Sequence, residues 1–268
     1  MPTLLQVGTG SGGMVVLDLL CREPSIERII LIEPDVYKSH NVYRNYFSGE
    51  CVGEKKVDLA ASWVKQFRTD LEVVTLGTDL LAGSHQGEIE AAVQSCDIGV
   101  CAVDNEPAKF HFDSLMRKFK KPWTLGEVLA GGIGGWVHSF QPNQACYGCV
   151  ASHLQRSIET DNRPPPDYAN PNAAIVETTI PASKASISVI ASLHAHLTLG
   201  LLAGTIPDFT SFLLPLAKVD GLFAAALRPF RFRIPRSPEC LICRADTAPA
   251  GEELDVALDQ ALSRLGHE

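Results

Sequence analysis

The chain has 268 residues, of which 46% are hydrophobic and 20% are charged, and its formal net charge at pH 7 is −8. This length allows one large α/β domain or two small ones, with enough apolar residues to build a core. The excess of acidic residues argues against binding to nucleic acid or to an anionic membrane surface. We therefore expect a globular protein with no nucleic-acid partner and no membrane partner.

The amino-terminal residues carry no basic segment before their apolar run and no small-residue cleavage site after it. We therefore expect no signal peptide and a cytoplasmic protein. The longest apolar stretch, residues 185–204, contains His194, His196 and several hydroxyl side chains, so a buried core helix fits it better than a membrane span. The two histidines would face opposite sides of that helix, and we assign them structural roles.

The first half of the chain alternates short apolar runs with segments of helical periodicity. Strands are expected at residues 3–7, 29–32, 73–76 and 98–103, and helices at residues 14–21, 57–67 and 112–119. Strands that alternate with helices form parallel sheets covered on both faces. This order predicts an α/β fold with a doubly wound, mostly parallel, Rossmann-like sheet.

The second half has a different texture. Residues 123–140 suggest further strands, joined by turns or bulges around the glycine-rich residues 131–135. Residues 161–167 form a proline-rich polar run, which predicts an exposed loop. Residues 252–265 carry leucines on one face and predict an amphipathic carboxyl-terminal helix. The composition shows no sharp shift that would mark a second independent domain.

A glycine pattern follows the first predicted strand. Gly8, Gly10 and Gly13 fit Gly-x-Gly-x-x-Gly between a strand and a helix, with Ser11 inside the pattern. Such glycines permit a tight turn and let a phosphate approach the backbone N–H groups at a helix N-terminus. Glu33 ends the second strand, where an acid can hydrogen-bond ribose hydroxyls. The pattern indicates a nucleotide, and an NAD-dependent dehydrogenase is its most frequent meaning.

The residues after Glu33 favour a different chemistry. Four polar residues follow it within reach of the same loop: Asp35, Asn41, Arg44 and Lys56. Arginine and lysine can bind a triphosphate and stabilise charge as pyrophosphate leaves, while carboxylates hold Mg²⁺. Hydride transfer needs none of these groups. Each charge alone is typical of a solvated loop, but together they indicate an enzyme that acts on the α-phosphate of ATP.

Two further polar residues, Asp104 and Asn105, directly follow the strand expected at residues 98–103. They would lie at the carboxyl edge of the sheet, where open α/β folds bind their ligands. Asp104 is therefore a candidate ligand of the nucleotide-bound Mg²⁺, with Asn105 beside it.

Two Cys-x-x-Cys pairs, Cys146 with Cys149 and Cys240 with Cys243, supply four thiolates for a tetrahedral Zn²⁺ site. A site with four protein ligands is closed, so its role would be structural. The alternative is two redox pairs, which we consider weaker because neither pair is expected to open a helix after a strand.

The remaining cysteines are isolated. Cys96 and Cys101 lie in or beside an apolar strand, and Cys21 lies on a helix face expected to pack on the sheet. Burial raises the pKa of a thiol, so these three are poor nucleophiles. Cys51, between Arg44 and the next lysines, is the one candidate for a reactive thiol, and we expect no thioester on this chain.

The combined motifs resemble those of the ThiF/MoeB/HesA family, the bacterial relatives of ubiquitin-activating enzymes. The similarity rests on the glycine loop, Glu33-x-Asp35, Asn41-x-x-Arg44, Gly53-x-x-Lys56, Asp104-Asn105, both cysteine pairs, Val219-Asp220-Gly221 and Arg236-Ser237-Pro238. The resemblance implies one adenylation domain over residues 1–268, with a nucleotide-binding half at 1–122 and a partner-binding half at 123–268. It also implies a homodimer that uses ATP and Mg²⁺.

Carried over by position, the resemblance implies that Gly10 and Ser11 line the phosphate loop and that Glu33 holds the ribose. It implies that Arg44 and Lys56 contact the phosphates with help from Asn41, and that Asp104 binds Mg²⁺ beside Asp35.

Three departures from the family pattern stand out. Glu33 replaces the usual aspartate, and Ser11 replaces a glycine. The chain begins at the first strand, without the segment whose arginine reaches the neighbouring subunit's ATP site. The region before Thr178, where some family members carry a catalytic cysteine, contains no cysteine.

The sequence thus predicts adenylation of the carboxyl-terminal glycine of a small ubiquitin-like or sulfur-carrier protein, with a downstream transfer protein as a possible further partner. Two rival hypotheses remain. An NAD-dependent oxidoreductase would explain only the glycine loop and the ribose acid. A non-catalytic scaffold that binds nucleotide would explain the missing arginine.

Overall fold

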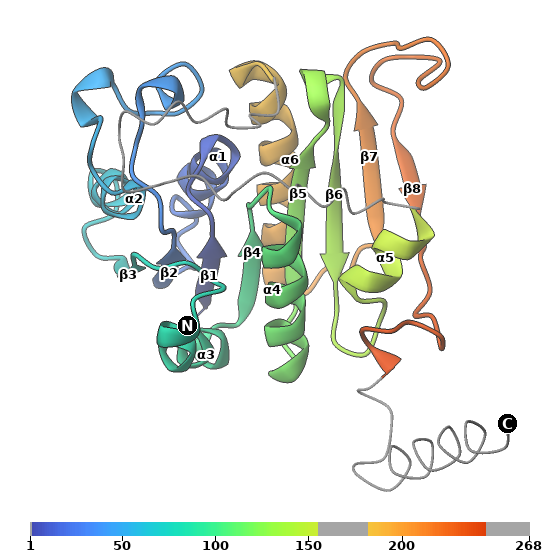
Figure 1. The fold of residues 1–268 in the computed structure, drawn as a ribbon, viewed down its shortest axis with the longest axis horizontal. Helices are drawn as coiled ribbons and strands as arrows, with labels where there is room; N and C mark the ends of the chain where they lie inside the picture. Colours follow the sequence, from blue (N-terminus) through green and yellow to red (C-terminus); the bar gives the residue numbers. More distant parts are fainter. Residues whose placement is uncertain (1, 155–181, 245–268) are drawn as a thin grey trace, which may run out of the picture.

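One mixed sheet runs through the molecule. The computed structural model describes residues 2–154 and 182–244, which form an eight-stranded sheet in the order β3-β2-β1-β4-β5-β6-β7-β8 (Figure 1). The strands are β1 (Thr3–Val7), β2 (Arg28–Ile32), β3 (Glu72–Leu76), β4 (Ile98–Cys101), β5 (Trp123–Val128), β6 (Gly134–Phe140), β7 (Ser211–Pro215) and β8 (Phe230–Phe232). Strands β1 to β5 are parallel, and β6, β7 and β8 each run antiparallel to the preceding strand. The predicted α/β fold with a mostly parallel, Rossmann-like sheet is confirmed.

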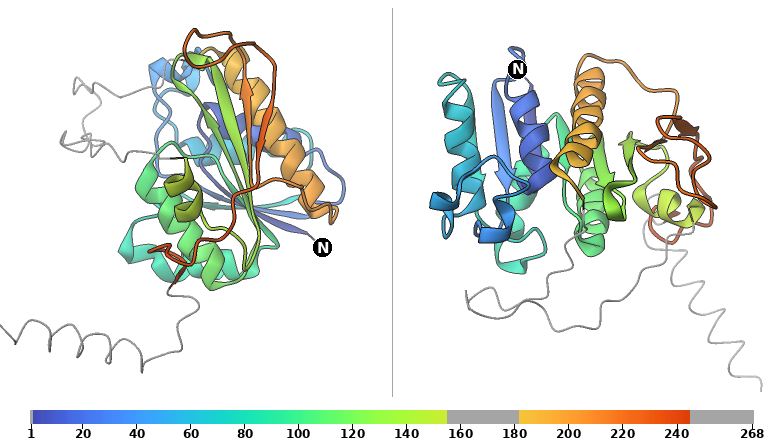
Figure 2. Two further views of the ribbon diagram at one scale, coloured as in Figure 1. Left: turned by 90° about the vertical axis from the view of Figure 1, so that its right-hand side faces the viewer. Right: turned by 90° about the horizontal axis from the view of Figure 1, so that it is seen from above.

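Helices cover both faces of this sheet. One face carries α1 (Ser11–Leu20), α2 (Lys56–Lys65) and α6 (Lys184–Leu202), and the other carries α3 (Gln86–Ser95), α4 (Glu106–Lys118) and α5 (Tyr147–His153). Short 3-10 turns are η1 (Ser39–Asn41), η2 (Gly49–Cys51), η3 (Gly83–His85) and η4 (Ala130–Gly132). Figure 2 shows α6 on one side of the antiparallel strands, with α4 and α5 on the other.

Alternation along each strand supplies both layers of the core. On β1, Leu4 packs among α1, α2 and α6, whereas Leu5 packs among α3 and α4. Successive strand residues point to opposite faces, so a run of apolar residues is buried twice. This explains why the parallel strands read as continuous apolar segments in the sequence.

Four helices differ from expectation. Helix α4 was expected from residue 112 but begins at Glu106, and α5 was not expected. Helix α3 was not expected, because its buried face consists of Ile89, Ala92 and Val93 among polar neighbours. The helix expected from residue 14 begins at Ser11, so the last part of the glycine pattern already belongs to the helix. The run at 161–167 and the helix expected at 252–265 lie outside the described residues.

Helix α6 packs closely on the sheet because two strand positions lack side chains. A Cβ added to Gly126 on β5 would lie 2.7 Å from His194 Nδ1, and one added to Gly135 on β6 would lie 2.5 Å from an Ile190 methylene carbon. His194 Nε2 lies 2.9 Å from Thr124 Oγ1 on β5. Burial lowers the pKa of His194 to about 4, so its imidazole is neutral in the folded chain.

By length and composition alone, the same helix is long and apolar enough to cross a membrane. It packs on β5 and α1 through one face, and 33% of its most apolar 18-residue stretch is buried, so the core-helix interpretation fits that face only. His196 is exposed, so the structural role that we assigned to it as part of a buried helix is not supported by burial. His194, by contrast, is the buried structural histidine that we predicted.

Candidate active site and metal centre

The glycine loop follows β1 and turns back into α1. Gly8 has φ +93, and a Cβ on it would lie 2.6 Å from the Ala102 carbonyl oxygen. A Cβ on Gly13 would lie 2.3 Å from the Gly8 carbonyl oxygen, so this glycine lets the helix pack directly on the loop. Both positions therefore require glycine for the backbone itself.

Gly10 has a different role because its surroundings are open. It is the N-cap of α1, no side chain caps the helix there, and an added Cβ would meet nothing within 4 Å. Ser11 opens the helix, so first-turn N–H groups face this open position. An uncapped helix N-terminus beside free space suits a phosphate group.

Gln6 on β1 fixes the glycine loop, a role that was not expected from the sequence. The Gln6 side chain is buried on β1, and its Nε2 donates to the carbonyl oxygens of Gly8 at 2.9 Å and Gly13 at 2.8 Å. The only signal was an amide side chain inside an otherwise apolar strand. Gln6 therefore holds the two ends of the glycine pattern together.

Glu33, the candidate ribose ligand, lies buried beside the loop. Its Oε2 accepts the Thr9 backbone N–H at 2.7 Å, and its Oε1 accepts the Asp35 N–H at 3.0 Å. Burial raises the pKa of the Glu33 carboxyl, although the Lys56 charge and the two N–H donors oppose that rise. The carboxylate thus ties the glycine loop to the residues that follow β2.

Lys56 is the first residue of α2. Its side chain is 11% exposed, and its Nζ lies 2.7 Å from Asp35 Oδ2. Through Glu33 and this ion pair, the glycine loop, the end of β2 and the start of α2 are joined. Lys56 therefore also neutralises the Asp35 carboxylate.

Asn41 and Arg44 lie on the segment between β2 and α2. Asn41 is buried in η1, and its Oδ1 accepts the Lys38 backbone N–H at 2.9 Å. Arg44 is half-buried just beyond that turn. The neighbouring Asn45 keeps its side-chain Nδ2 buried without a hydrogen-bond partner among the described residues, which leaves a donor next to Arg44. Cys51 is half-exposed in η2 of the same segment.

Asp104 and Asn105 separate at the end of β4. Asp104 is exposed, whereas the Asn105 side chain caps α4 by accepting the Ala108 N–H at 3.0 Å. Because β1 lies between β2 and β4, the glycine loop stands between Asp35 and Asp104 at the carboxyl edge. The structure places these predicted residues on one edge of the sheet, and Asn105 has a local structural role there.

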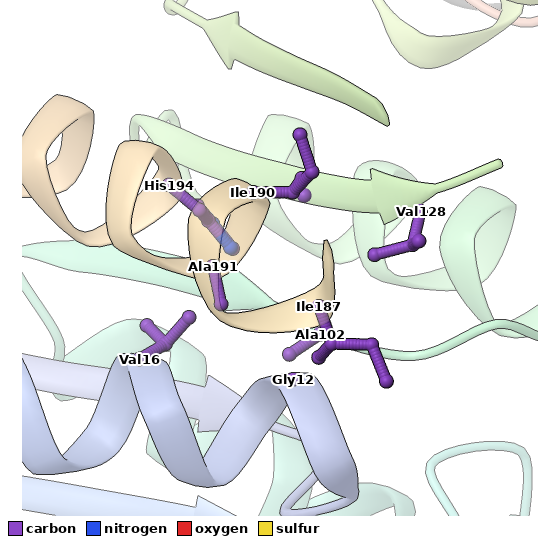
Figure 3. Close-up of a pocket in the computed structure, with 9 residues that line it drawn as sticks. Gly12, Val16, Ala102, Val128, Ile187, Ile190, Ala191 and His194 are labelled. Atoms are coloured by element: carbon purple, nitrogen blue, oxygen red, sulfur yellow. The ribbon is translucent and has the colours of Figure 1, made fainter. Parts of the chain in front are cut away.

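Two cavities lie on the α6 side of the sheet. One of about 40 Å³ lies between the first turns of α1 and α6, with Gly12, Ala102, Ile187 and His194 in its wall (Figure 3). It is too small and too apolar for a nucleotide. The other, of about 290 Å³, lies between α6 and β7, with Leu197 and Phe212 in its wall. Neither includes the polar residues of the candidate active site.

The four cysteines of the two pairs converge. The Sγ atom of Cys146 lies 3.7 Å from that of Cys149 and 3.6 Å from that of Cys240, and Cys149 lies 3.6 Å from Cys243. All four sulfur atoms lie within 4.8 Å of one another. Tetrahedral zinc with bonds of about 2.3 Å would place its sulfur ligands about 3.8 Å apart. The cluster therefore fits a tetrahedral metal ion in size and ligand type.

One premise about these pairs was wrong. Cys146 is the N-cap of α5, so the first pair does open a helix, after the loop that leaves β6. The redox alternative is weakened instead by the meeting of all four thiols. Ser237 N–H also points at Cys149 Sγ, with the nitrogen 3.4 Å away, as expected for a donor to a metal-bound thiolate.

The three isolated buried cysteines are poor nucleophiles, as expected. Burial raises the pKa of Cys21 to about 11, and that of both Cys96 and Cys101 to about 12. Each side chain is fully buried in the core. Among the isolated thiols that the structure describes, Cys51 alone is partly exposed.

Comparisons with known proteins agree with this geometry. The family model described as "ThiF family" matches residues 3–242. Ubiquitin-like modifier-activating enzyme 5 of Culex quinquefasciatus is 23% identical over 54% of this chain and 38% of its own length. The Drosophila melanogaster enzyme of the same name is 26% identical with the same coverage. The chain thus matches well under half of these curated relatives.

Solved structures share the fold. Escherichia coli MccB crystallised with ATP superposes with a TM-score of 0.67 and 17% identity, covering 90% of this chain and 66% of that one. The microcin C7 biosynthetic enzyme MccB in complex with N-formylated MccA gives a TM-score of 0.70 at 16% identity, covering 90% and 67%. Taken with the glycine loop, the sheet edge and the cysteine cluster, the family match over residues 3–242 places this chain in the ThiF family.

Proposed function

We propose that this protein uses ATP to adenylate the terminal carboxylate of a small protein or peptide. The supporting observation is the carboxyl edge of the sheet, where the Asp35–Lys56 pair, an uncapped helix N-terminus and the exposed Asp104 follow the ends of three neighbouring strands. Such a set can bind a triphosphate and bear charge as pyrophosphate leaves. The related MccB, crystallised with ATP and with MccA, supports a nucleotide and a small partner.

In finer detail, we assign the substrate to a ubiquitin-like or sulfur-carrier protein that ends in glycine. Its carboxylate attacks the α-phosphorus of ATP, the bond to the bridging oxygen breaks, and pyrophosphate leaves. No general base is needed because a carboxylate is already a nucleophile. Arg44 and Lys56 bind phosphate oxygens, Glu33 receives the ribose, and the N-terminus of α1 supplies N–H donors.

The metals have separate roles in this proposal. Asp104 would hold a nucleotide-bound Mg²⁺, which neutralises phosphate charge when present. Cys146, Cys149, Cys240 and Cys243 would hold a structural Zn²⁺ that ties α5 to the carboxyl-terminal segment. Residues 1–122 would bind the nucleotide and residues 123–268 the partner. A homodimer and a downstream transfer protein complete the proposal.

ATP–pyrophosphate exchange tests the function directly. The purified protein is incubated with ATP, Mg²⁺ and a small ubiquitin-like protein that ends in Gly-Gly. Arg44→Met and Asp104→Asn should each lower exchange by roughly 10²-fold with unchanged melting, the usual effect of removing one preorganised charge. Lys118→Met is the control, because Lys118 pairs with Glu90 at 2.8 Å on the surface away from this edge.

The outcomes separate the rival functions. Exchange that persists in both site variants would contradict the assigned roles. ATP binding without exchange would indicate a non-catalytic scaffold. Binding of NAD, with hydride transfer and no response to ATP, would indicate an oxidoreductase.

A further inference from the structure

A buried chain of polar side chains crosses the face of the sheet that carries α4. Lys109 Nζ lies 2.6 Å from Glu106 Oε1 and 2.6 Å from Glu127 Oε1. Glu127 Oε2 lies 3.0 Å from His138 Nε2, and His138 Nδ1 lies 2.8 Å from Ser211 Oγ. These contacts join α4 to β5, β6 and β7 in one sequence of hydrogen bonds.

Burial excludes a nucleophilic role for this chain. Glutamate, histidine and serine in this order resemble a hydrolase triad, but the side chains of His138 and Ser211 are 0% exposed. No substrate can reach Ser211 Oγ, so this end of the chain anchors Glu127 in the sheet.

Lys109 is the charged centre of the arrangement. Its side chain is 5% exposed, whereas those of Glu106 and Glu127 are 32% and 13% exposed. Burial favours the neutral amine, but the two carboxylates outweigh burial and raise the pKa of Lys109, so it stays protonated. One ammonium thus bridges two carboxylates on different elements, with geometry that a mobile surface pair would not keep.

The other end of the chain reaches the candidate active site. Glu106 is the first residue of α4, directly after Asn105 and two positions after Asp104. Its second oxygen, Oε2, accepts the hydroxyl of Tyr147 at 2.7 Å, which adds a tie to α5. The first turn of α4 is therefore fastened to β5 through Lys109 and to α5 through Glu106.

Within residues 2–154 and 182–244, no side chain fastens the exposed Asp104 directly, so its position depends on the turn between β4 and α4. We propose that Lys109 is a positioning residue, which holds this turn so that Asp104 is oriented toward a nucleotide-bound Mg²⁺. The inference rests on the proposed function for the role of Asp104. Lys109 itself touches neither metal nor nucleotide, because it is buried between α4 and β5.

The test compares Lys109→Met with Lys109→Arg and with Lys118→Met, a control on the same helix. Hydrogen exchange of residues 102–108 reports the order of the turn, and calorimetry at several Mg²⁺ concentrations reports ATP·Mg²⁺ binding. We expect Lys109→Met to lose protection at the turn and to need about tenfold more Mg²⁺, the usual cost of removing a residue that orients a metal ligand. Lys109→Arg should restore much of both, and Lys118→Met should change neither.

A second variant keeps the test valid if two unpaired carboxylates prevent folding. Glu106→Gln, Lys109→Met and Glu127→Gln together remove every charge of the bridge. Proteins often tolerate the replacement of a whole buried ionic network by neutral side chains. This variant should fold and still show the loosened turn. In an Asp104→Asn background, Lys109→Met should add no further Mg²⁺ effect, because its influence passes through Asp104.

Unchanged protection and unchanged Mg²⁺ dependence in folded Lys109→Met would overturn the inference. Additive losses in the double variant would also overturn it. If the wild-type protein exchanges no pyrophosphate, the proposed function fails, but turn protection and ATP·Mg²⁺ calorimetry still decide the role of Lys109.

Discussion

The two candidate sites differ in how many of their polar groups already interact with the protein when no ligand is bound. At the nucleotide edge, which is the carboxyl edge of the sheet around the glycine loop, Glu33 and Lys56 already have protein partners. Glu33 accepts two backbone N–H groups, and Lys56 is paired with Asp35. At the cysteine cluster, four thiols converge in the core, and burial raises the pKa of Cys146. Buried thiols that face one another are stabilised little by protein hydrogen bonds and strongly by coordination to a metal ion.

This difference in internal hydrogen bonding predicts which site contributes more to the stability of the fold. The nucleotide edge keeps its geometry through internal hydrogen bonds, so its ligand should change activity more than stability. The cysteine cluster joins α5 to the segment around Cys240, so its metal should change stability more than chemistry. Four experiments can break or sharpen this contrast.

The largest expected effect is loss of the metal. We expect one zinc per chain, and Cys243→Ser should lose zinc and several kcal/mol of stability, somewhat below the value of about 10 kcal/mol for small zinc peptides. Metal analysis and urea unfolding measure both quantities. Cys51→Ser, at an isolated half-exposed position, is the control and should retain zinc. Full zinc occupancy in Cys240→Ser would contradict a four-cysteine site.

Acid should destabilise the protein through His194. Its folded pKa of about 4 lies below the ordinary 6.5, so the unfolded chain takes up the proton first. The stability from neutral His194 is fully present above pH 6.5 and is lost as the pH falls toward 4, in total about 3 kcal/mol. We measure the free energy of unfolding by urea at several pH values in this range. His194→Gln should weaken its dependence on pH, whereas substitution of the exposed His196 by Gln should not. Equal slopes in both variants would refute the assignment.

Lys56 should affect both properties, unlike Arg44 and Asp104. Lys56→Met leaves the partly buried Asp35 carboxylate without its ion-pair partner, so we expect a loss of about 1–3 kcal/mol besides the loss of exchange. Thermal melting beside the exchange assay measures the two effects together. Asp35→Asn with Lys56→Met should recover stability but no activity. Unchanged melting of Lys56→Met alone would show that the pair is unimportant for the fold.

The smallest expected effect is that of replacing Cys51, which should leave the reaction unchanged. The other isolated thiols are buried and Cys51 is the one remaining candidate, and we expect no thioester between this chain and its partner. Incubation with ATP, Mg²⁺ and partner, followed by reducing and non-reducing gels, tests this. A reducible adduct that disappears in Cys51→Ala would show a transfer step on this chain.

Local patterns made much of this molecule predictable. The glycine pattern, the apolar strands and the cysteine spacing each lie within a few residues, and each keeps one meaning in most folds. Helix α3 escaped because its buried face is narrow and interrupted by polar residues. The start of α1 was misplaced because glycines hid the first helical turn.

Long-range polar contacts were not predictable in the same way. Lys109 and Glu127 are 18 residues apart, and His138 and Ser211 are 73 apart. Each is a common surface residue type, so nothing in the local sequence distinguishes it from a solvated side chain. The dual role of Lys56 escaped for the same reason, since Asp35 approaches it only after β2 and α2 have formed.

The cysteine cluster also sets an order of events during folding. Its partner thiols are 94 residues apart in the chain, as are Leu4 on β1 and Ile98 on β4, but its last ligand, Cys243, follows every strand of the described sheet. A ligand set closed over that separation can assemble only after residue 243 has been synthesised, when β1 to β5 are already available to pair. We therefore expect metal loading to be the last step of maturation, completing a chain whose nucleotide edge has already formed.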